Sequence, residues 1–412
     1  MRNGAVFVRA VALVAVAPLV PGPGEAAARA AADPAAPLTT AYRGVRIAVP
    51  PGWDVHRLDR DPSRCVRLDR DAIYLGRPAD QQDCPARLVG GADVVHVEPL
   101  DRGRGARRAA VRPDRLASYT VPANDARGVE LALPEAGVKI TATYGTDPAA
   151  LQSVIRSARL SGSWTPEPTR AAPAPSNART TAERPKRWAV GRGFDTCAAP
   201  SLNTMAAWRR SYGISNIYIG GAARGCAQYN LSARWVRAVR AMKYRLIPTY
   251  VGLQAPCTRY RSRFTPANAA REGSRAAADA VYRARRLGIP RRMPIYFDIE
   301  GYDSGKAWCR NAVMTFLHSY SRRMTALKYT PAVYSSVASG IRDLGRATGI
   351  TKPRAIWFAH WDGSVRMYGN PYLLDHWWHP HRRIKQYRGG HKEKHGGITL
   401  NIDSNYVDGR VY

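Results

Sequence analysis

Two carboxylates lie one pleat apart at the end of an apolar run. The run is Met293-Pro-Ile-Tyr-Phe-Asp-Ile-Glu-Gly301, which has the pattern of a buried β-strand. Side chains alternate along a strand, so Tyr296, Asp298 and Glu300 are expected on one face and the apolar residues between and before them on the other. Because unpaired acids are costly to bury, a strand that ends in this way predicts an opening into a wet cleft.

Paired carboxylates of this kind are the usual equipment of glycoside hydrolysis, in which two acids at short range take different pKa values. Two other interpretations stay open from this strand alone. The acids can be salt-bridge partners of nearby arginines, or they can be metal ligands.

The segment from residue 188 to the C-terminus contains eight strand-like runs. They are residues 191–195, 216–219, 246–251, 294–300, 331–334, 355–359, 383–387 and 400–403. Amphipathic stretches at 267–287 and 312–327 lie between early runs. Strands that alternate with helices predict an α/β fold, here a (β/α)8 barrel of the TIM type over residues 188–412. A doubly wound open sheet competes with it, but no glycine-rich phosphate loop follows the first strand.

The few acidic residues of this segment gather at predicted strand ends. From Trp188 onward there are twelve acidic residues against thirty-six basic ones. Most of these acids lie at or just past a strand end: Asp195, Asp298, Glu300, Asp303, Asp362, Asp403 and Asp408. Barrel active sites are built at the carboxyl ends of the strands, so the clustering predicts a site there.

Aromatic side chains that can stack on sugar rings are expected at the same face. They are Tyr250, Tyr302, Trp308, Tyr334, Trp357, Trp361, Trp377, Trp378 and Tyr387. Ordinary barrel packing explains Trp357 at least as well as ligand binding does. Tyr250, Trp361 and Tyr387 lie near strand ends and are the better candidates for ligand contact.

The chain begins with the pattern of a secretory signal peptide at residues 1–30. Arg2 and Arg9 flank a short basic region, an apolar run follows at 10–20, and small residues at 26–30 suit cleavage. The two arginines are not adjacent, so a twin-arginine route is not supported. The apolar run is too short to span a bilayer, so a secreted protein without stable membrane insertion is expected.

Two further segments precede the barrel. Residues 42–164 hold short β-like runs, turns and a short helix at 148–158, which predicts a small α+β domain of unknown function. Residues 165–187 are rich in Pro, Ala, Thr and Arg and lack hydrophobic periodicity, so we expect a disordered linker.

Six cysteines fit an oxidising compartment. No Cys-x-x-Cys or Cys/His cluster has zinc-like spacing, so disulfides are expected, and no metal or cofactor. The expected pairs are Cys65–Cys84, Cys197–Cys226 and Cys257–Cys309, the last two being one of three possible pairings within the barrel segment.

The formal net charge is +32, most of it from arginine. Such a charge attracts anionic polymers such as nucleic acid, teichoic acid or a phosphorylated envelope glycan. The arginines are scattered, however, and an arginine-rich, lysine-poor composition fits the codon bias of a GC-rich genome. Nucleic acid is not an expected partner because no recognition motif or dense basic block is present. Retention on an acidic cell wall stays open.

Six motifs resemble those of a known family. They are Gly193-Phe-Asp-Thr-Cys197, Tyr250-Val-Gly-Leu-Gln-Ala-Pro-Cys257, Ile295-Tyr-Phe-Asp-Ile-Glu-Gly-Tyr302, Val333-Tyr-Ser-Ser336, Ile356-Trp-Phe-Ala359 and Asn401-Ile-Asp-Ser-Asn-Tyr406. In this order they resemble the glycoside-hydrolase-like barrel domain of secreted actinobacterial proteins. That family is similar to the family-25 glycoside hydrolases, the N-acetylmuramidase lysozymes. The resemblance covers residues 190–412, although the loops of this chain carry extra Trp, Arg and disulfides.

The resemblance implies roles for four acids. Glu300 is the general acid that protonates the glycosidic oxygen, and Asp298 positions the 2-acetamido group or stabilises the developing positive charge. Asp195 and Asp403 hold the pair and tune its pKa values. The expected substrate contacts are Tyr250, Tyr302, Tyr334, Trp361, Gln386 and Tyr387, of which the last two match the Gln-Tyr of the family's seventh strand.

Two functions of different classes follow from these observations. One is a secreted glycoside hydrolase that cuts peptidoglycan or a related cell-envelope polysaccharide. The other is a catalytically silent barrel that binds cell-wall glycan. Both use the aromatic residues, but only the enzyme requires a protonated Glu300 near neutral pH. The sequence predicts no oligomeric state.

Overall fold

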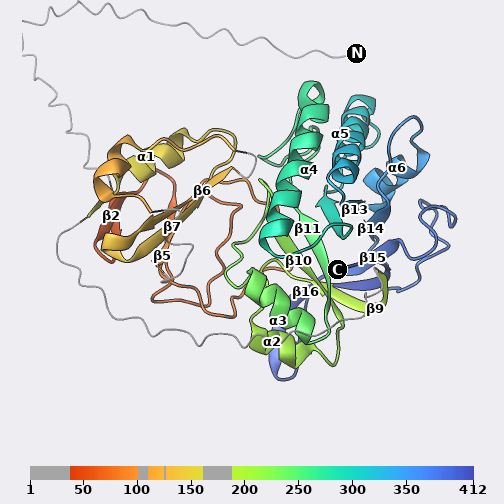
Figure 1. Cartoon of the computed structure of the whole chain (residues 1–412), viewed down its shortest axis with the longest axis horizontal. Helices are drawn as coiled ribbons and strands as arrows, with labels where there is room; N and C mark the ends of the chain where they lie inside the picture. Colours follow the sequence, from red (N-terminus) through yellow and green to blue (C-terminus); the bar gives the residue numbers. More distant parts are fainter. Residues whose placement is uncertain (1–37, 101–109, 125–126, 161–187) are drawn as a thin grey trace, which may run out of the picture. The chain divides into compact units, whose positions relative to one another are not determined.

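The computed structural model describes residues 38–100, 110–124, 127–160 and 188–412. Leu38–Tyr412 form one compact unit, whose elements are labelled in Figure 1. The predicted signal peptide and linker lie outside the described residues. Within the described ranges, no helix combines the length and the apolar character that a membrane span requires.

Residues 38–160, the N-terminal module below, contain two sheets. The smaller sheet has the order β1 (Thr39–Tyr42), β2 (Val45–Ala48) and β8 (Arg159–Leu160). The larger has the order β3 (Asp54–Arg57), β4 (Ala72–Leu75), β5 (Val94–Pro99), β7 (Val138–Thr143) and β6 (Gly128–Leu133). The helical elements are η1 (Pro113–Ser118), η2 (Pro134–Ala136) and α1 (Ala149–Ser157). This composition is α+β, and the domain boundaries stay a prediction.

Residues 188–412 form a closed barrel of eight strands in the order β10-β11-β12-β13-β14-β15-β16-β9. The strands are β9 (Trp188–Asp195), β10 (Ile214–Gly220), β11 (Arg245–Tyr250), β12 (Pro294–Asp298), β13 (Thr330–Ser336), β14 (Ala355–Ala359), β15 (Arg383–His395) and β16 (Ile398–Arg410). Each of the eight predicted runs coincides with one of these strands.

The helices of the barrel segment lie between its first six strands. They are α2 (Leu202–Trp208), α3 (Ala233–Ala241), η3 (Pro266–Asn268), α4 (Ala269–Arg286), α5 (Ala307–Ala326), η4 (Val337–Ile341) and α6 (Arg342–Arg346). Helices α4 and α5 lie side by side (Figure 1). A Cβ on Gly273 of α4 would lie 2.2 Å from the Phe316 carbonyl oxygen of α5, so the small residue permits this close contact.

The prediction of a (β/α)8 barrel is wrong. Strand β16 is antiparallel to both of its neighbours, β15 and β9, and residues 188–412 hold five α-helices rather than eight. Gly396 and Gly397 both have positive φ and join β15 to β16 as a two-residue hairpin. A hairpin reverses the chain without a crossover helix. The last strand therefore closes the barrel by pairing antiparallel with both neighbours, whereas the other strands are parallel.

Two apolar layers hold the barrel. Inside, side chains such as Tyr296, Trp357 and Ile384 fill the lumen. Outside, Phe297 packs against Phe316 of α5, with ring centroids 4.8 Å apart. The polar site therefore lies at one end of a filled barrel, as is usual for closed barrels of eight strands.

Candidate active site

The alternation of β12 turns the predicted acids away from the helices. Phe297 packs on α5, and Tyr320 of α5 donates its hydroxyl to the Ile295 carbonyl at 3.0 Å. Tyr296 belongs to the lumen cluster instead. The predicted strand phase is therefore confirmed, and Asp298 follows Tyr296 on the inner face.

The end of β12 is fixed by a side chain that the sequence analysis did not single out. Gln254 accepts a hydrogen bond from the Glu300 N–H at 2.8 Å and donates to the Asp298 carbonyl at 3.0 Å. This glutamine is fully buried. Because one amide bonds both residues, the backbone that carries the two acids has little freedom.

A second pair of acids lies across the barrel on β9 and β16, where Asp195 and Asp403 are opposite each other in the ladder. The Gln386 amide donates to Asp195 and to Asp403 Oδ2, both at 3.1 Å. Asn405 also donates to Asp195, and accepts from Trp357 Nε1 at 2.8 Å. Trp357 is thus a structural residue that holds Asn405, as the packing interpretation proposed.

Burial raises the pKa of all four acids above the ordinary carboxyl range. The charge of Asp403 raises the pKa of Asp195 further, and that of Glu300 does so for Asp298. Burial brings the pKa of Asp403 to about 6, although the cation of Arg87 opposes the rise. Carboxyls in this state retain protons that solvated carboxyls lose.

Arg87 comes from the N-terminal module and reaches these acids. Its guanidinium donates to the Tyr334 hydroxyl, lies 3.5 Å from Glu300 Oε2, and stands 5.1 Å from the Trp361 ring centroid. Its burial alone would lower its pKa, but the surrounding phenol and carboxylates raise it above the ordinary value. The salt-bridge interpretation of the acids therefore applies to Glu300. One arginine in a loop of such a basic chain gave no signal in the sequence.

Two of the predicted aromatic contacts join this cluster. The Tyr334 hydroxyl and Trp361 Nε1 both donate to Gln386 Oε1, each at 2.9 Å. Tyr334 is buried, whereas Trp361 is 55% exposed. Trp361 therefore offers an open ring beside the carboxylates.

Three other predicted contacts have different surroundings. Tyr250 donates its hydroxyl to Asp279 of α4 at 2.9 Å, and Tyr302 donates to Asp343 of α6 at 2.8 Å. Both hydroxyls thus bond to helices outside the barrel. Tyr387 is half-buried beside Gln386 on β15.

A groove of about 570 Å³ runs beside Glu300. Its lining includes Tyr260, Gly301, Tyr302, Ser336 and Ser339. Burial and the charge of Glu300 raise the pKa of Tyr260 to about 12, so its phenol is a neutral hydrogen-bonding group near the acids. A chain of sugars laid in this groove would pass the end of β12.

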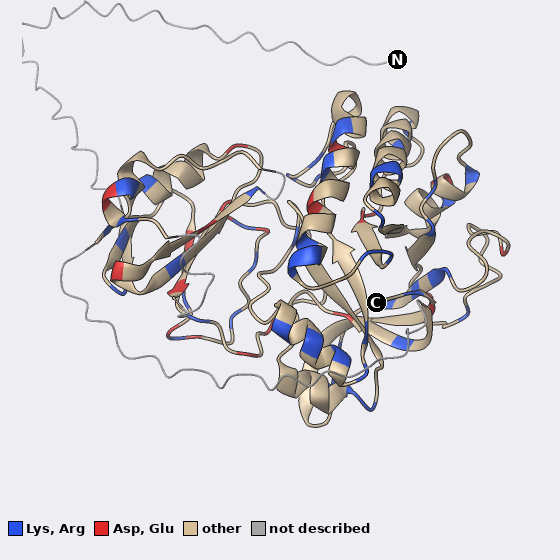
Figure 2. Cartoon of the chain, in the orientation of Figure 1, with Lys and Arg blue, Asp and Glu red and all other residues tan. Residues whose placement is uncertain are grey.

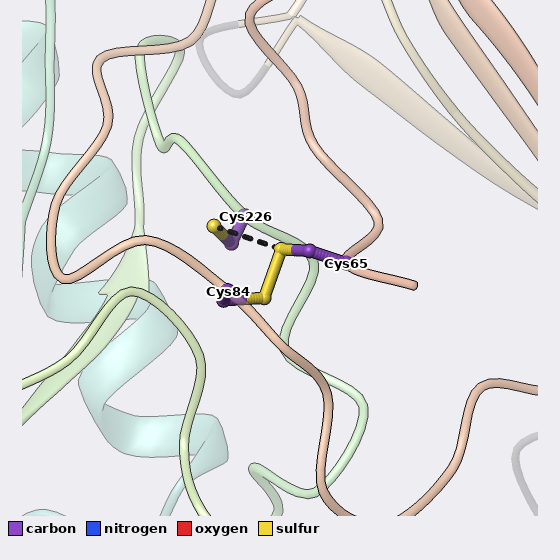
Figure 3. Close-up of side chains that lie close together, drawn as sticks. All are labelled: Cys65, Cys84 and Cys226. Atoms are coloured by element: carbon purple, nitrogen blue, oxygen red, sulfur yellow. Dashed lines mark hydrogen bonds between the residues drawn. A yellow bond between two sulfur atoms is a disulfide. The ribbon is translucent and has the colours of Figure 1, made fainter. Parts of the chain in front are cut away.

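The three predicted disulfides are confirmed: Cys65–Cys84, Cys197–Cys226 and Cys257–Cys309. Cys65 Sγ also lies 3.6 Å from Cys226 Sγ, so two of the bridges touch (Figure 3). The sulfurs of Cys65, Cys84 and Cys226 are close enough together for one metal ion. All three are oxidised, and a disulfide supplies no thiolate ligand.

Basic residues are spread over the helices and loops of the barrel segment (Figure 2). The predicted strand-end acids that lie outside the cluster have nitrogen-bearing side chains as partners. Asp362 binds Lys385 at 2.8 Å, and Asp408 contacts His381 at 2.6 Å. Asp298 and Glu300 differ from these, because Asp298 Oδ1 and Glu300 Oε1 have no hydrogen-bond partner among the described residues.

Residues 206–407 match the family model described as "Rv2525c-like, glycoside hydrolase-like domain". Residues 206–407 of the barrel are therefore similar to the glycoside hydrolase-like domains of this family. The resemblance seen in the sequence is therefore confirmed. A comparison with curated proteins found no match.

Several solved structures are similar to the chain. An uncharacterized B. stearothermophilus protein is 17% identical over 54% of this chain and 99% of its own, with a TM-score of 0.37. The Tat-secreted Mycobacterium tuberculosis protein Rv2525c, solved with L-tartrate, is 16% identical over 52% and 93%, also with a TM-score of 0.37. The modular autolysin LytC of Streptococcus pneumoniae is 12% identical over 52% of this chain and 46% of its own, with a TM-score of 0.35.

Proposed function

We propose that this protein is a secreted glycoside hydrolase that cuts peptidoglycan or a related cell-envelope polysaccharide. In this proposal Glu300 is the general acid and Asp298 the carboxylate that stabilises developing positive charge. The observation that carries it is the pair of buried acids at the end of β12, each with one oxygen that has no hydrogen-bond partner within the described part of the chain. Buried polar atoms are normally satisfied, so unpartnered ones at a cleft point to a ligand.

The raised pKa values of both acids support the presence of a proton on the pair, and the assignment of that proton to Glu300 is part of the proposal. A general acid has to hold its proton near the working pH, and burial raises the pKa of Glu300 in that direction. Asp298 and Glu300 interact, so the pair titrates as a unit. As Glu300 gives its proton to the leaving oxygen and the glycosidic bond breaks, an ionised Asp298 stabilises the oxocarbenium-like transition state.

The remaining acids and the amides have a positioning role in the proposal. Gln386 holds Asp195 and Asp403 and carries the hydrogen bonds of Tyr334 and Trp361. A sugar stacked on Trp361 would therefore be placed relative to the carboxylates by one shared amide. Secretion and cell-wall association belong to the same proposal, and three disulfides fit an oxidising compartment.

The test is release of reducing ends from purified peptidoglycan by the full-length protein and by Glu300→Gln. Loss of acid catalysis lowers the rate by about 10²–10⁴-fold, while the amide keeps the size of the side chain. Asp114→Asn is the control, because this acid lies in the N-terminal module and its side chain is 60% exposed. Asp298→Asn should also reduce turnover strongly.

The alternative is a silent glycan-binding barrel. It is favoured if the wild type and Glu300→Gln bind cell walls equally and release the same trace of product. A normal rate in Glu300→Gln would remove this residue from the mechanism.

A further inference from the structure

Two stretches of the N-terminal module pair with one loop of the barrel. The loop follows β10 at residues 221–227, and residues 66–68 and 89–90 form bridges to it. The backbone hydrogen bonds, donor first, are Leu68 to Gly225 (2.8 Å), Ala227 to Val66 (3.0 Å) and Gly90 to Ala223 (2.7 Å). The module is therefore attached by backbone pairing, which fixes its register as well as its contact.

The pairing is close enough to require glycine. A Cβ on Gly90 would lie 2.2 Å from the Arg224 carbonyl oxygen and 2.9 Å from that of Leu68. Both are backbone atoms that cannot rotate away, so Gly90→Ala has to push the module and the loop apart. A Cβ on Gly213 would meet only the Arg209 guanidinium at 3.7 Å, which makes Gly213→Ala a matched control.

The residues that follow Arg87 pack into the barrel. Leu88 packs against the cluster of the two touching disulfides. Val89 packs against Tyr218 of β10 and against Val251, which directly follows β11. Arg87 is consequently held at the rim by its neighbours.

Arg87 blocks access to the carboxylates of Asp298 and Glu300. Asp298 is 3% and Glu300 7% exposed, with the guanidinium 3.5 Å from Glu300 and bonded to Tyr334. A general acid has to approach the glycosidic oxygen within hydrogen-bond distance. A polymeric glycan cannot do so while Arg87 occupies this place.

We propose that the N-terminal module is an intramolecular inhibitor of the barrel, with Arg87 as the residue that blocks the carboxylate pair. The inhibition rests on the function proposed above, whereas the blocking of the acids does not. The module has to shift before a glycan reaches Glu300.

The charge of Arg87 argues against a role in substrate binding. A cation beside Glu300 favours the ionised form of this acid, whereas the proposed reaction begins with the protonated form. The guanidinium is also engaged by Tyr334, Glu300 and Trp361, all of them protein groups. An arginine placed in this way opposes the first step of the reaction.

The first experiment measures access to the acids without using activity. The full-length protein and its variants are treated with a water-soluble carbodiimide and an amine, and amide formation at Asp298 and Glu300 is followed by peptide mass spectrometry. Arg87→Ala and Gly90→Ala are expected to be labelled at least about tenfold faster than the wild type. Arg57→Ala, a module arginine paired with Asp59, and Gly213→Ala should match the wild type.

The second experiment measures reducing-end release from peptidoglycan with the same proteins. Arg87→Ala and Gly90→Ala are expected to exceed the wild-type rate by at least about tenfold. Unchanged labelling in both variants would overturn the blocking. Faster labelling with a lower rate that Arg87→Lys restores would overturn the inhibition and make Arg87 a substrate-binding residue. Faster labelling with no activity in any variant would support the blocking and reject the proposed enzyme.

Discussion

The pKa of Asp403 leads to a quantitative prediction about stability. Burial raises it from 3.8 to about 6 in the folded protein. Since a shift of one pKa unit corresponds to about 1.36 kcal/mol, the shift of Asp403 is equivalent to about 3 kcal/mol. A carboxyl whose folded pKa is raised stabilises the protein at low pH, and this stability is lost as the pH rises through the folded pKa.

Asp403→Asn removes this titration. The free energy of unfolding of the variant, minus that of the wild type, should therefore increase by about 2–3 kcal/mol between pH 4 and pH 8. The charge of Asp403 also raises the pKa of Asp195. Removal of this charge therefore changes the difference in unfolding free energy between variant and wild type in the same direction. Any fixed cost of the new amide against Gln386 is independent of pH and does not alter the slope.

The assay is urea unfolding followed by the fluorescence of the ten tryptophans at four pH values from 4 to 8. Asp114→Asn replaces an acid whose side chain is 60% exposed and serves as the control. A difference between Asp403→Asn and wild type that stays level across this range would refute the reasoning, because Asp403 would then titrate alike in the folded and unfolded chains.

Two other predictions concern the rim. Trp361→Ala should weaken glycan binding by about tenfold, equivalent to about 1.4 kcal/mol, because its exposed ring lies beside the acids. Equilibrium binding to solubilised cell-wall fragments tests this, with Trp308→Ala, which replaces another exposed ring, as the control. Equal losses of affinity in both variants would contradict the prediction. Replacement of Cys257 and Cys309 together by serine opens a loop with a sequence separation of 52. This change should lower the free energy of unfolding by about 4 kcal/mol. An unchanged urea midpoint without reductant would show that this bridge does not restrain the unfolded chain.

Local patterns predicted much of the barrel. Alternation along 294–300 assigned Asp298 and Tyr296 to the inner face, because a strand has only two faces and one of them packs on helices. The order of the cysteines along the strands predicted the two barrel bridges, and the location of Cys65 and Cys84 in the first half of the chain predicted the third. Both inferences use contacts between neighbouring elements, which the order of the chain constrains strongly.

The hairpin was missed because the outer half of its first strand has no apolar pattern. Residues 388–395 of β15 are polar or glycine and alternate between half-buried and exposed, so they show no hydrophobic period. Only Gly396-Gly397 marks the turn, and this dipeptide is a known hairpin signal. The expectation of one crossover helix per strand overrode it, and that error produced the wrong fold class.

The direction in which a side chain at a strand end points was also not predictable from the sequence. Tyr250 and Tyr334 both lie at or near strand ends, yet Tyr250 bonds to Asp279 of α4 and Tyr334 to Gln386 inside the barrel. The difference depends on the pleat of each strand at its last residue. A position near a strand end therefore predicts a nearby cleft, but not which rings line it.

The buried acids and Arg87 depend on each other. Asp195, Asp298, Glu300 and Asp403 lie in one small volume, where isolated ionised carboxylates are strongly disfavoured. Amide donors satisfy Asp195 and Asp403 in part, and Arg87 is the cation beside Glu300. The cation of Arg87 lowers the pKa of Glu300 and of Asp403, whereas burial, the larger effect, raises the pKa of both. Displacement of the module removes this cation and also lets water reach the acids, so its two effects on the pKa of Glu300 oppose each other.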